Sequence, residues 1–179
     1  MIYKFRVILD TLDDVFRDIE IQSADTLEDL HNVINQSFGL EGGEMAAFYE
    51  SDEEWSQGME YLLFDMGDEA EAQLMHEVKL EDILDKNNTR LIYLYDFFNM
   101  WTFYVELADI SDAEEGTTYP NLLFVHGQLP DAPPEKQFEA DEKPKKKEAW
   151  EELMDFEDEF NDGNDFDSLD DFDFDEKWN

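Results

Sequence analysis

The chain has 179 residues, in which 49 Asp and Glu outnumber 12 Lys and Arg, giving a formal net charge of −37 at pH 7. Hydrophobic residues make up 42% of the chain, which is enough for a folded core, so part of the acid must lie outside that core. The absence of cysteine excludes disulfide scaffolds, thiolate nucleophiles and cysteine-ligated metal sites.

The distribution of charge speaks against nucleic-acid and anionic-membrane partners. Residues 18–77 contain no Lys or Arg, and such a surface repels a phosphate backbone. Apolar runs stay shorter than the 18 residues that a membrane-spanning helix needs, and residues 1–10 have the pattern of a strand rather than of a signal peptide. We therefore expect a cytoplasmic protein.

Two alternating segments come first. Apolar side chains at every second position predict strands over residues 2–9 and 15–21, joined by a turn at residues 11–14. Folded back as a hairpin, they would place two basic side chains of the first strand opposite two acidic side chains of the second. These side chains are Lys4 and Arg6, and Asp18 and Glu20.

A helix is predicted after this hairpin. Thr26 and Asp29 have the spacing of a capping box, apolar residues recur at helical spacing as far as Phe38, and Gly39 stands where a C-terminal cap belongs. His31 lies on or beside the apolar stripe. Because no second metal ligand stands at a suitable spacing, we interpret it as a packed residue rather than a catalytic one.

Strand-like and acidic segments alternate in the middle of the chain. We expect strands at residues 44–50 and 59–64, separated by an acidic loop around Trp55. A second acidic loop is expected at residues 65–73, and residues 79–84 are typical of one or two helical turns.

The clearest strand prediction is residues 91–97, which are apolar on both faces, as in a strand buried on both sides. A partner strand is expected at residues 101–107, and another apolar segment runs from Tyr119 to Val125, after which the ordered pattern fades. These elements predict the α+β class, with a mixed β-sheet, a helix packed on one face, and a β-grasp (ubiquitin-like) arrangement.

Composition divides the chain into three regions. Residues 1–130 are the expected α+β core domain, residues 131–147 a Pro/Lys-rich linker, and residues 148–179 an acidic tail with interspersed aromatic residues, typical of a disordered interaction segment. The basic cluster at residues 143–147 has the composition of a nuclear import signal or a phosphate-binding patch. We interpret it instead as a solvated hinge whose positive charge offsets the negative charge of the tail.

Motifs for catalysis or metal binding are absent from the sequence. The three histidines lie 45 and 50 residues apart, which excludes the common zinc spacings, and no phosphate-binding glycine loop or nucleophile elbow occurs. Placing Gly163 at the sixth position of an EF-hand loop puts Phe160 and Leu169 where oxygen ligands are required. We therefore predict no catalytic residue, no metal and no cofactor.

Asp96 stands out among the many carboxylates because it interrupts an apolar strand. If the side chain were buried, its pKa would rise, as a general acid or base requires. At the end of the strand it would instead cap the following turn, and we favour that interpretation. A pocket formed with Tyr95 and Trp101 would favour an enzyme.

Several segments, in their order along the chain, match a known family. They are residues 26–31, 78–84 and 93–97, Trp101, Tyr119-Pro120, Pro133-Pro134 and residues 165–173. The chain resembles the plasmid ORF-three-like family, first named from an Ri plasmid, and within it a divergent acid-rich branch of the Bacteroides type. The resemblance implies a compact α+β domain and brings no established activity. Where that family has Gly-Asp-Asp, this chain has Phe98, Asn99 and Met100, so a site built on those acids would be missing.

The sequence favours a non-enzymatic protein-interaction module whose acidic tail or core binds a basic protein partner. Two alternatives stay open. In the first, the acidic surface mimics nucleic acid and occupies the basic site of a DNA- or RNA-binding protein. In the second, the chain is an enzyme whose site the sequence does not reveal.

Overall fold

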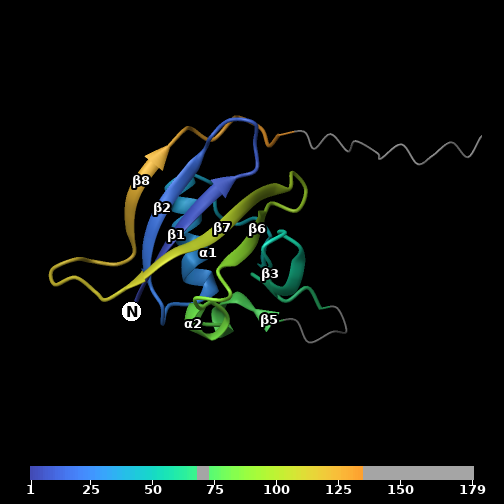
Figure 1. Ribbon diagram of the computed structural model, residues 1–179. Coiled ribbons are helices and arrows are strands. Elements are labelled where there is room, and N and C mark those ends of the chain that lie inside the picture. The colour runs from blue at the N-terminus through green and yellow to red at the C-terminus, as the bar shows by residue number, and fades with distance from the viewer. Residues whose placement is uncertain (68–72, 135–179) are drawn as a thin grey trace, which may run out of the picture. The chain divides into compact units, whose positions relative to one another are not determined.

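Eight strands form a single sheet in the computed structural model, which describes residues 1–67 and 73–134 (Figure 1). The strands are β1 (Ile2–Leu9), β2 (Phe16–Gln22), β3 (Ala46–Ser51), β4 (Gln57–Leu62), β5 (Gln73–Leu74), β6 (Arg90–Tyr95), β7 (Trp101–Ser111) and β8 (Asn121–His126). Their spatial order is β5-β4-β3-β6-β7-β1-β2-β8. The helical elements are α1 (Leu27–Phe38), the 3-10 turn η1 (Met75–Glu77) and the short α2 (Leu80–Ile83).

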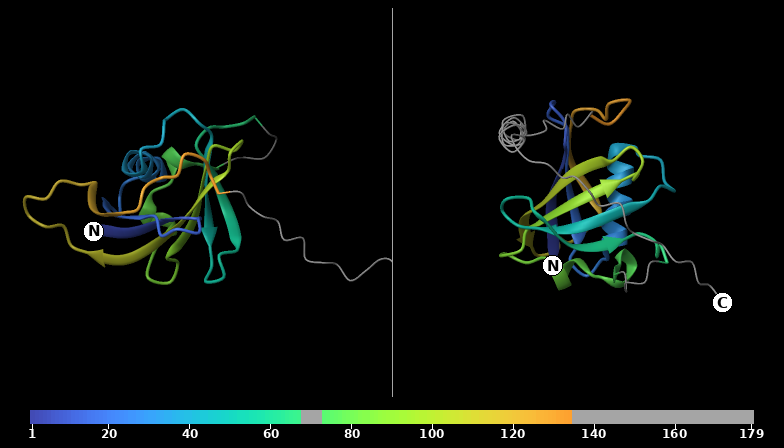
Figure 2. Two further views of the ribbon diagram at one scale, coloured as in Figure 1. Left: turned by 90° about the horizontal axis from the view of Figure 1, so that it is seen from above. Right: turned by 90° about the vertical axis from the view of Figure 1, so that its right-hand side faces the viewer.

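The α+β class and the mixed sheet are confirmed. Neighbouring strands are antiparallel except β4 and β5, which are parallel, and α1 lies against one face of the sheet (Figure 2). The β-grasp arrangement is not confirmed. β1 pairs antiparallel with both of its neighbours, β2 and β7, within an eight-stranded order.

The predicted hairpin of β1 and β2 has the expected register. Lys4 is the Cα partner of Glu20, and Arg6 is the partner of Asp18. Alternation of side chains explains this register, because it places the apolar row of each strand in the core and the charged row on the other face.

α1 begins and ends as the sequence predicts. The Thr26 hydroxyl accepts a hydrogen bond from the Asp29 amide at 3.2 Å, and the Asp29 carboxylate accepts one from the Thr26 amide at 2.9 Å. Gly39 ends the helix in the left-handed conformation, at φ 72°. The buried side of α1 packs its apolar stripe, from Leu27 to Phe38, against the sheet.

Large aromatic side chains fill the space between α1 and the sheet. Phe5, Phe48, Tyr93 and Phe103 are fully buried, and the Tyr93 ring lies 4.7 Å from that of Phe48. β6 is buried on both faces, as predicted, since Ile92 and Leu94 on its opposite face are also buried. Burial of this apolar surface is the main stabilising term of the fold.

The main differences from the predicted elements are at strand ends. β7 continues to Ser111 rather than stopping near residue 107, because its extra residues pair with the first residues of β1. β4 begins at Gln57 and so takes in part of the predicted acidic loop. The predicted linker and tail, apart from residues 131–134, lie outside the described residues.

Candidate interaction surface

β8 forms one end of the sheet, and within the described residues its outer side has no neighbouring strand. Four consecutive apolar side chains of β8 are between 41% and 53% exposed. Together with two neighbouring aromatic residues they form what we call the β8 surface. It consists of Phe16, Leu122, Leu123, Phe124, Val125 and His126. Edge strands are normally protected and apolar patches normally covered, so an apolar edge of this kind makes the β8 surface a candidate interaction site.

A β-bulge interrupts the pairing of β8 with β2. Asp18 pairs with Phe124 and Ile19 pairs with Leu122, which leaves Leu123 as an extra residue without a Cα partner in β2. A bulge bends and twists an edge strand and so disfavours the addition of a further regular strand. The β8 surface is therefore suited to contact through side chains rather than through continued strand pairing.

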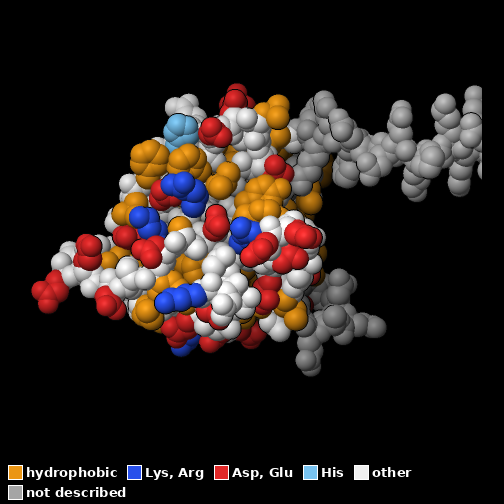
Figure 3. Space-filling view, viewed as in Figure 1, with side chains coloured by type: hydrophobic (Ala, Val, Ile, Leu, Met, Phe, Trp, Pro, Cys, Tyr) orange, Lys and Arg blue, Asp and Glu red, His pale blue; other side chains and the backbone are white. Residues whose placement is uncertain are grey.

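Three aromatic rings gather on the face of the sheet opposite α1. Phe16 stacks on Phe124 at 5.8 Å and on His126 at 5.1 Å, and the rings of Phe124 and His126 are within 7° of parallel. In the space-filling view, hydrophobic side chains and a histidine lie together over β2 and β8 (Figure 3). The arrangement presents a flat aromatic area at the surface.

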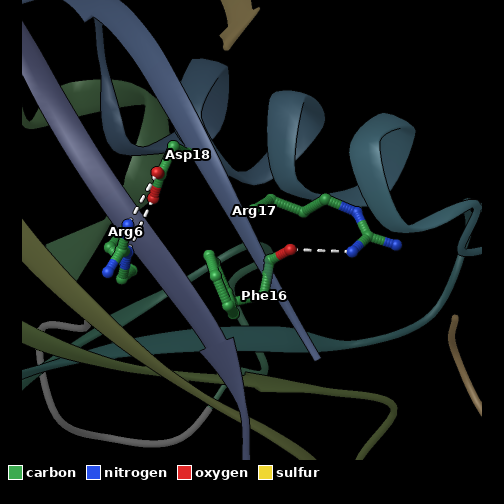
Figure 4. Close-up of polar contacts among 4 residues, drawn as sticks. All are labelled: Arg6, Phe16, Arg17 and Asp18. Atoms are coloured by element: carbon green, nitrogen blue, oxygen red, sulfur yellow. Dashed lines mark hydrogen bonds and ion pairs between the residues drawn. The ribbon is translucent and has the colours of Figure 1, made fainter. Parts of the chain in front are cut away.

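An ion pair borders this aromatic area. Arg6 donates hydrogen bonds from Nε and Nη2 to the two carboxylate oxygens of Asp18, each at 2.8 Å (Figure 4). Its guanidinium carbon lies 4.6 Å from the centre of the Phe16 ring. The hydrogen bond from Arg6 lowers the pKa of Asp18, so the carboxylate is charged at neutral pH.

Arg17 of β2 lies on the opposite face of the sheet and connects β2 with β8 (Figure 4). Its buried guanidinium donates to three main-chain carbonyls, those of Ser37 at 2.9 Å, Phe16 at 2.8 Å and His126 at 2.9 Å. It also lies over the ring of Phe38, with the guanidinium carbon 4.5 Å from the ring centre. Arg17 thus joins the end of α1 to β2 and β8.

A second candidate is a cleft of about 360 Å³ beside α1, which reaches the buried side chains of His31 and Asn35. The Tyr93 hydroxyl donates to Asn35 Oδ1 at 2.9 Å and lies 2.7 Å from His31 Nδ1, while Asn35 Nδ2 lies 3.2 Å from His31 Nε2. The Tyr93 hydroxyl has one proton, which it donates to Asn35 Oδ1. His31 Nδ1 must therefore donate to the Tyr93 oxygen, and His31 Nε2 must accept from Asn35 Nδ2.

Burial keeps His31 neutral within this closed ring of hydrogen bonds. Burial lowers the pKa of His31 to about 4, and burial raises the pKa of Tyr93. Each of the three side chains forms a hydrogen bond with the other two, so the group is suited to a structural role. The expectation that His31 is a packed residue is consistent with this geometry.

Asp96 lies at the end of β6 and caps the turn that follows. Its carboxylate accepts from the amides of Phe98 and Asn99 and from Asn99 Nδ2, and its backbone has φ 57°. These hydrogen bonds, with that from the Asn99 side chain first, lower the pKa of Asp96. The capping interpretation is confirmed, and the alternative of a buried carboxylate with a raised pKa is wrong. Tyr95 and Trp101 have their side chains buried in the core.

The remaining sequence features divide between described and undescribed residues. Among the described residues, no group of three His, Asp or Glu side chains is placed to hold a metal ion. No helix in that part of the chain is long and apolar enough to cross a membrane. The rejected EF-hand loop around Gly163, the basic cluster at residues 143–147 and the tail at residues 148–179 lie outside the described residues.

The described residues define an α+β protein in which one large sheet is backed by the long helix α1. The chain belongs to the family described as plasmid pRiA4b ORF-3-like protein, whose sequence profile matches residues 1–177. This confirms the family resemblance. No curated protein matches the chain.

A similar fold occurs in a solved structure, that of the protein of unknown function MM3350 from Methanosarcina mazei Go1. The two chains are 22% identical, with a TM-score of 0.59 over 69% of this chain and 68% of that one. At this level of identity the similarity concerns the fold alone.

Proposed function

We propose that this protein is a non-enzymatic interaction protein that binds a basic protein partner through the β8 surface. The observation that supports it most is the run of four half-exposed apolar side chains, from Leu122 to Val125, in the strand that ends the sheet among the described residues, on an otherwise strongly acidic domain. A few side chains that become fully desolvated, aromatic ones above all, carry most of the binding energy of a protein interface, and Phe124 lies within this run.

The charge of the domain favours a basic partner. Residues 1–134 contain 30 Asp and Glu against 6 Lys and Arg, a formal charge of −24. The negative electrostatic field of this charge accelerates the encounter with a positively charged protein and disfavours the encounter with an acidic one. The tail at residues 148–179 adds charge of the same sign and contributes to the same attraction.

A capture experiment with the full-length protein tests this proposal. The bait is compared with a double variant, Leu123→Glu and Val125→Glu, and with a control double variant, Met59→Glu and Phe64→Glu. The control residues are 53% and 52% exposed and lie away from β8, so both variants add the same charge at similarly exposed positions.

We expect a basic protein that the wild type and the control retain and that the β8 variant loses. The partner is then purified and its dissociation constant is measured against all three proteins. Equal binding by the three proteins, or an acidic partner, would refute the proposal. Loss of binding only on truncation to residues 1–147 would place the contact in the tail instead, and displacement of the partner by duplex DNA would favour a nucleic-acid mimic.

A further inference from the structure

We infer that the β8 surface recognises an arginine side chain of its partner, an inference that rests on the proposed interaction function. The chain has three arginines, and each of them lies over an aromatic ring. Arg6 lies over Phe16 at 4.6 Å, Arg17 over Phe38 at 4.5 Å and Arg90 over Trp55 at 5.1 Å. Stacking of a guanidinium on an aromatic ring is therefore a recurrent contact in this fold.

The β8 surface offers more aromatic area than the chain's own arginines occupy. Phe124 is 51% exposed, His126 is also exposed, and their rings are nearly parallel. Arg6 covers only the neighbouring Phe16. Since Arg17 and Arg90 are placed on other rings, a further guanidinium on Phe124 or His126 must come from another molecule.

The electrostatic surroundings suit a cation at this position. Asp18 and Glu20 share the outward face of β2 with Phe16, because side chains two residues apart in a strand point the same way. Arg6 and Asp18 neutralise each other through their two hydrogen bonds, and Lys4 lies opposite Glu20 on the same face. The face stays net negative because Glu106 and Asp109 of β7 lie beside these pairs. An incoming arginine therefore meets aromatic faces within a negative field.

The molecule that binds the β8 surface is a segment of a different protein rather than a second copy of this chain. Two domains that each carry a formal charge of −24 repel each other, and a second copy has all three arginines on rings of its own.

Arginine is favoured over lysine because its planar, weakly hydrated guanidinium stacks on a ring, whereas the lysine ammonium is strongly hydrated.

The test is a titration of the full-length ¹⁵N-labelled protein, followed by NMR, with capped peptides of equal charge. The probes are Ac-Ala-Arg-Ala-Arg-Ala-NH2 and its lysine counterpart. Site-resolved shifts separate binding at the β8 surface from general attraction to acidic residues elsewhere. Phe124→Leu removes the ring but keeps an apolar side chain, and Phe64→Leu is the matched control at 52% exposure.

We expect the arginine peptide to shift the amide signals of Phe16, Phe124 and His126 and to bind more tightly there than the lysine peptide. Phe124→Leu should weaken arginine binding about two- to fivefold, and Phe64→Leu should leave it unchanged. Equal affinity for both peptides, an unaffected Phe124→Leu variant, or no shift at these residues would overturn the inference.

The failure of this inference is distinguishable from that of the proposed function. If a basic partner is lost by the Leu123→Glu and Val125→Glu variant but still binds Phe124→Leu with unchanged affinity, the β8 surface is an interaction site without arginine recognition. If the first variant retains the partner, the proposed function itself fails.

Discussion

Arg17 donates a hydrogen bond from Nη1 to the main-chain carbonyl of His126, which lies 109 residues further along the chain, at 2.9 Å. Through Nε the same guanidinium donates to Ser37 in the last turn of α1. A buried charge needs such partners because it has lost its water. The aromatic part of the β8 surface, formed by Phe16, Phe124 and His126, therefore depends for its position on a residue that lies on the opposite face of the sheet.

Replacing this residue tests that dependence. Arg17→Met should reduce the free energy of unfolding by about 2 to 4 kcal/mol, because three carbonyls lose a charged donor and some of them stay buried. Urea unfolding followed by circular dichroism measures the loss. Arg6→Met is the comparison, because Arg6 is exposed; its bidentate ion pair with Asp18, which is 13% exposed, should contribute about 1 kcal/mol. A larger loss for Arg6→Met than for Arg17→Met would contradict the assignment.

Gly127 fixes the end of β8 in a second way. At φ 72° it adopts a left-handed conformation, and a Cβ atom there would lie 2.6 Å from the carbonyl oxygen of Asp14. Gly39 has the same φ of 72° but open space around it. Gly39→Ala should cost about 1 kcal/mol of unfolding free energy from backbone strain alone, and Gly127→Ala should cost clearly more.

Comparison of the two glycine variants in the same urea experiment isolates the steric contact, since both glycines have the same φ. Gly127→Ala should also shift the NMR signals of His126 and its neighbours in β2. Equal losses for the two variants would show that the turn after β8 rearranges freely.

Local patterns account for the parts of the fold that the sequence predicts well. The register of β1 and β2 follows from alternation across a short turn, and the ends of α1 follow from Thr26, Asp29 and Gly39. The burial of β6 follows from its uninterrupted apolar residues. Each of these features depends on residues that are close together in the chain.

The β8 surface could not be predicted because it is made by pairing distant segments. Phe16 and His126 come into contact only when β2 and β8 become neighbours, and nothing in the apolar run from Leu122 to Val125 indicates which strand it joins. The β-grasp prediction failed to be confirmed for the same reason, since strand order is a long-range property. One local signal was available, because Arg17 interrupts the row of buried apolar residues of β2, and a charge in such a row indicates a buried ionic contact.

Asp96 provides a test of the turn between β6 and β7. Asp96→Ala should lower the free energy of unfolding by about 1 to 2 kcal/mol, because alanine loses the hydrogen bonds to the turn and tolerates φ 57° poorly. Asp96→Asn should cost under about 0.5 kcal/mol, because its Oδ1 accepts from the two amides, its Nδ2 donates to Asn99 once that side-chain amide is flipped, and asparagine adopts this conformation readily. Equal losses in urea unfolding would show that the charge of Asp96, rather than its geometry, holds the turn.

The hydrogen-bond ring of His31, Asn35 and Tyr93 predicts a pH dependence of stability. The ordinary pKa of a histidine is 6.5, and burial lowers that of His31 to about 4 in the folded protein. As the pH falls below 6.5, the unfolded chain binds a proton that the folded protein does not bind until about pH 4. Folding therefore loses stability in that window, and the contribution is fully present above it.

We expect this histidine to remove about 2 kcal/mol of stability between pH 7 and pH 5. Protonation at Nε2 would turn the acceptor that faces Asn35 Nδ2 into a donor, and rotating the Asn35 amide to accept it would leave the Tyr93 hydroxyl without its acceptor. His31→Gln is the comparison, because glutamine does not titrate. Urea unfolding at both pH values gives the difference between the two proteins, in which the titration of the shared carboxylates cancels. A difference that does not change with pH would show that His31 is protonated equally easily in the folded and unfolded chains.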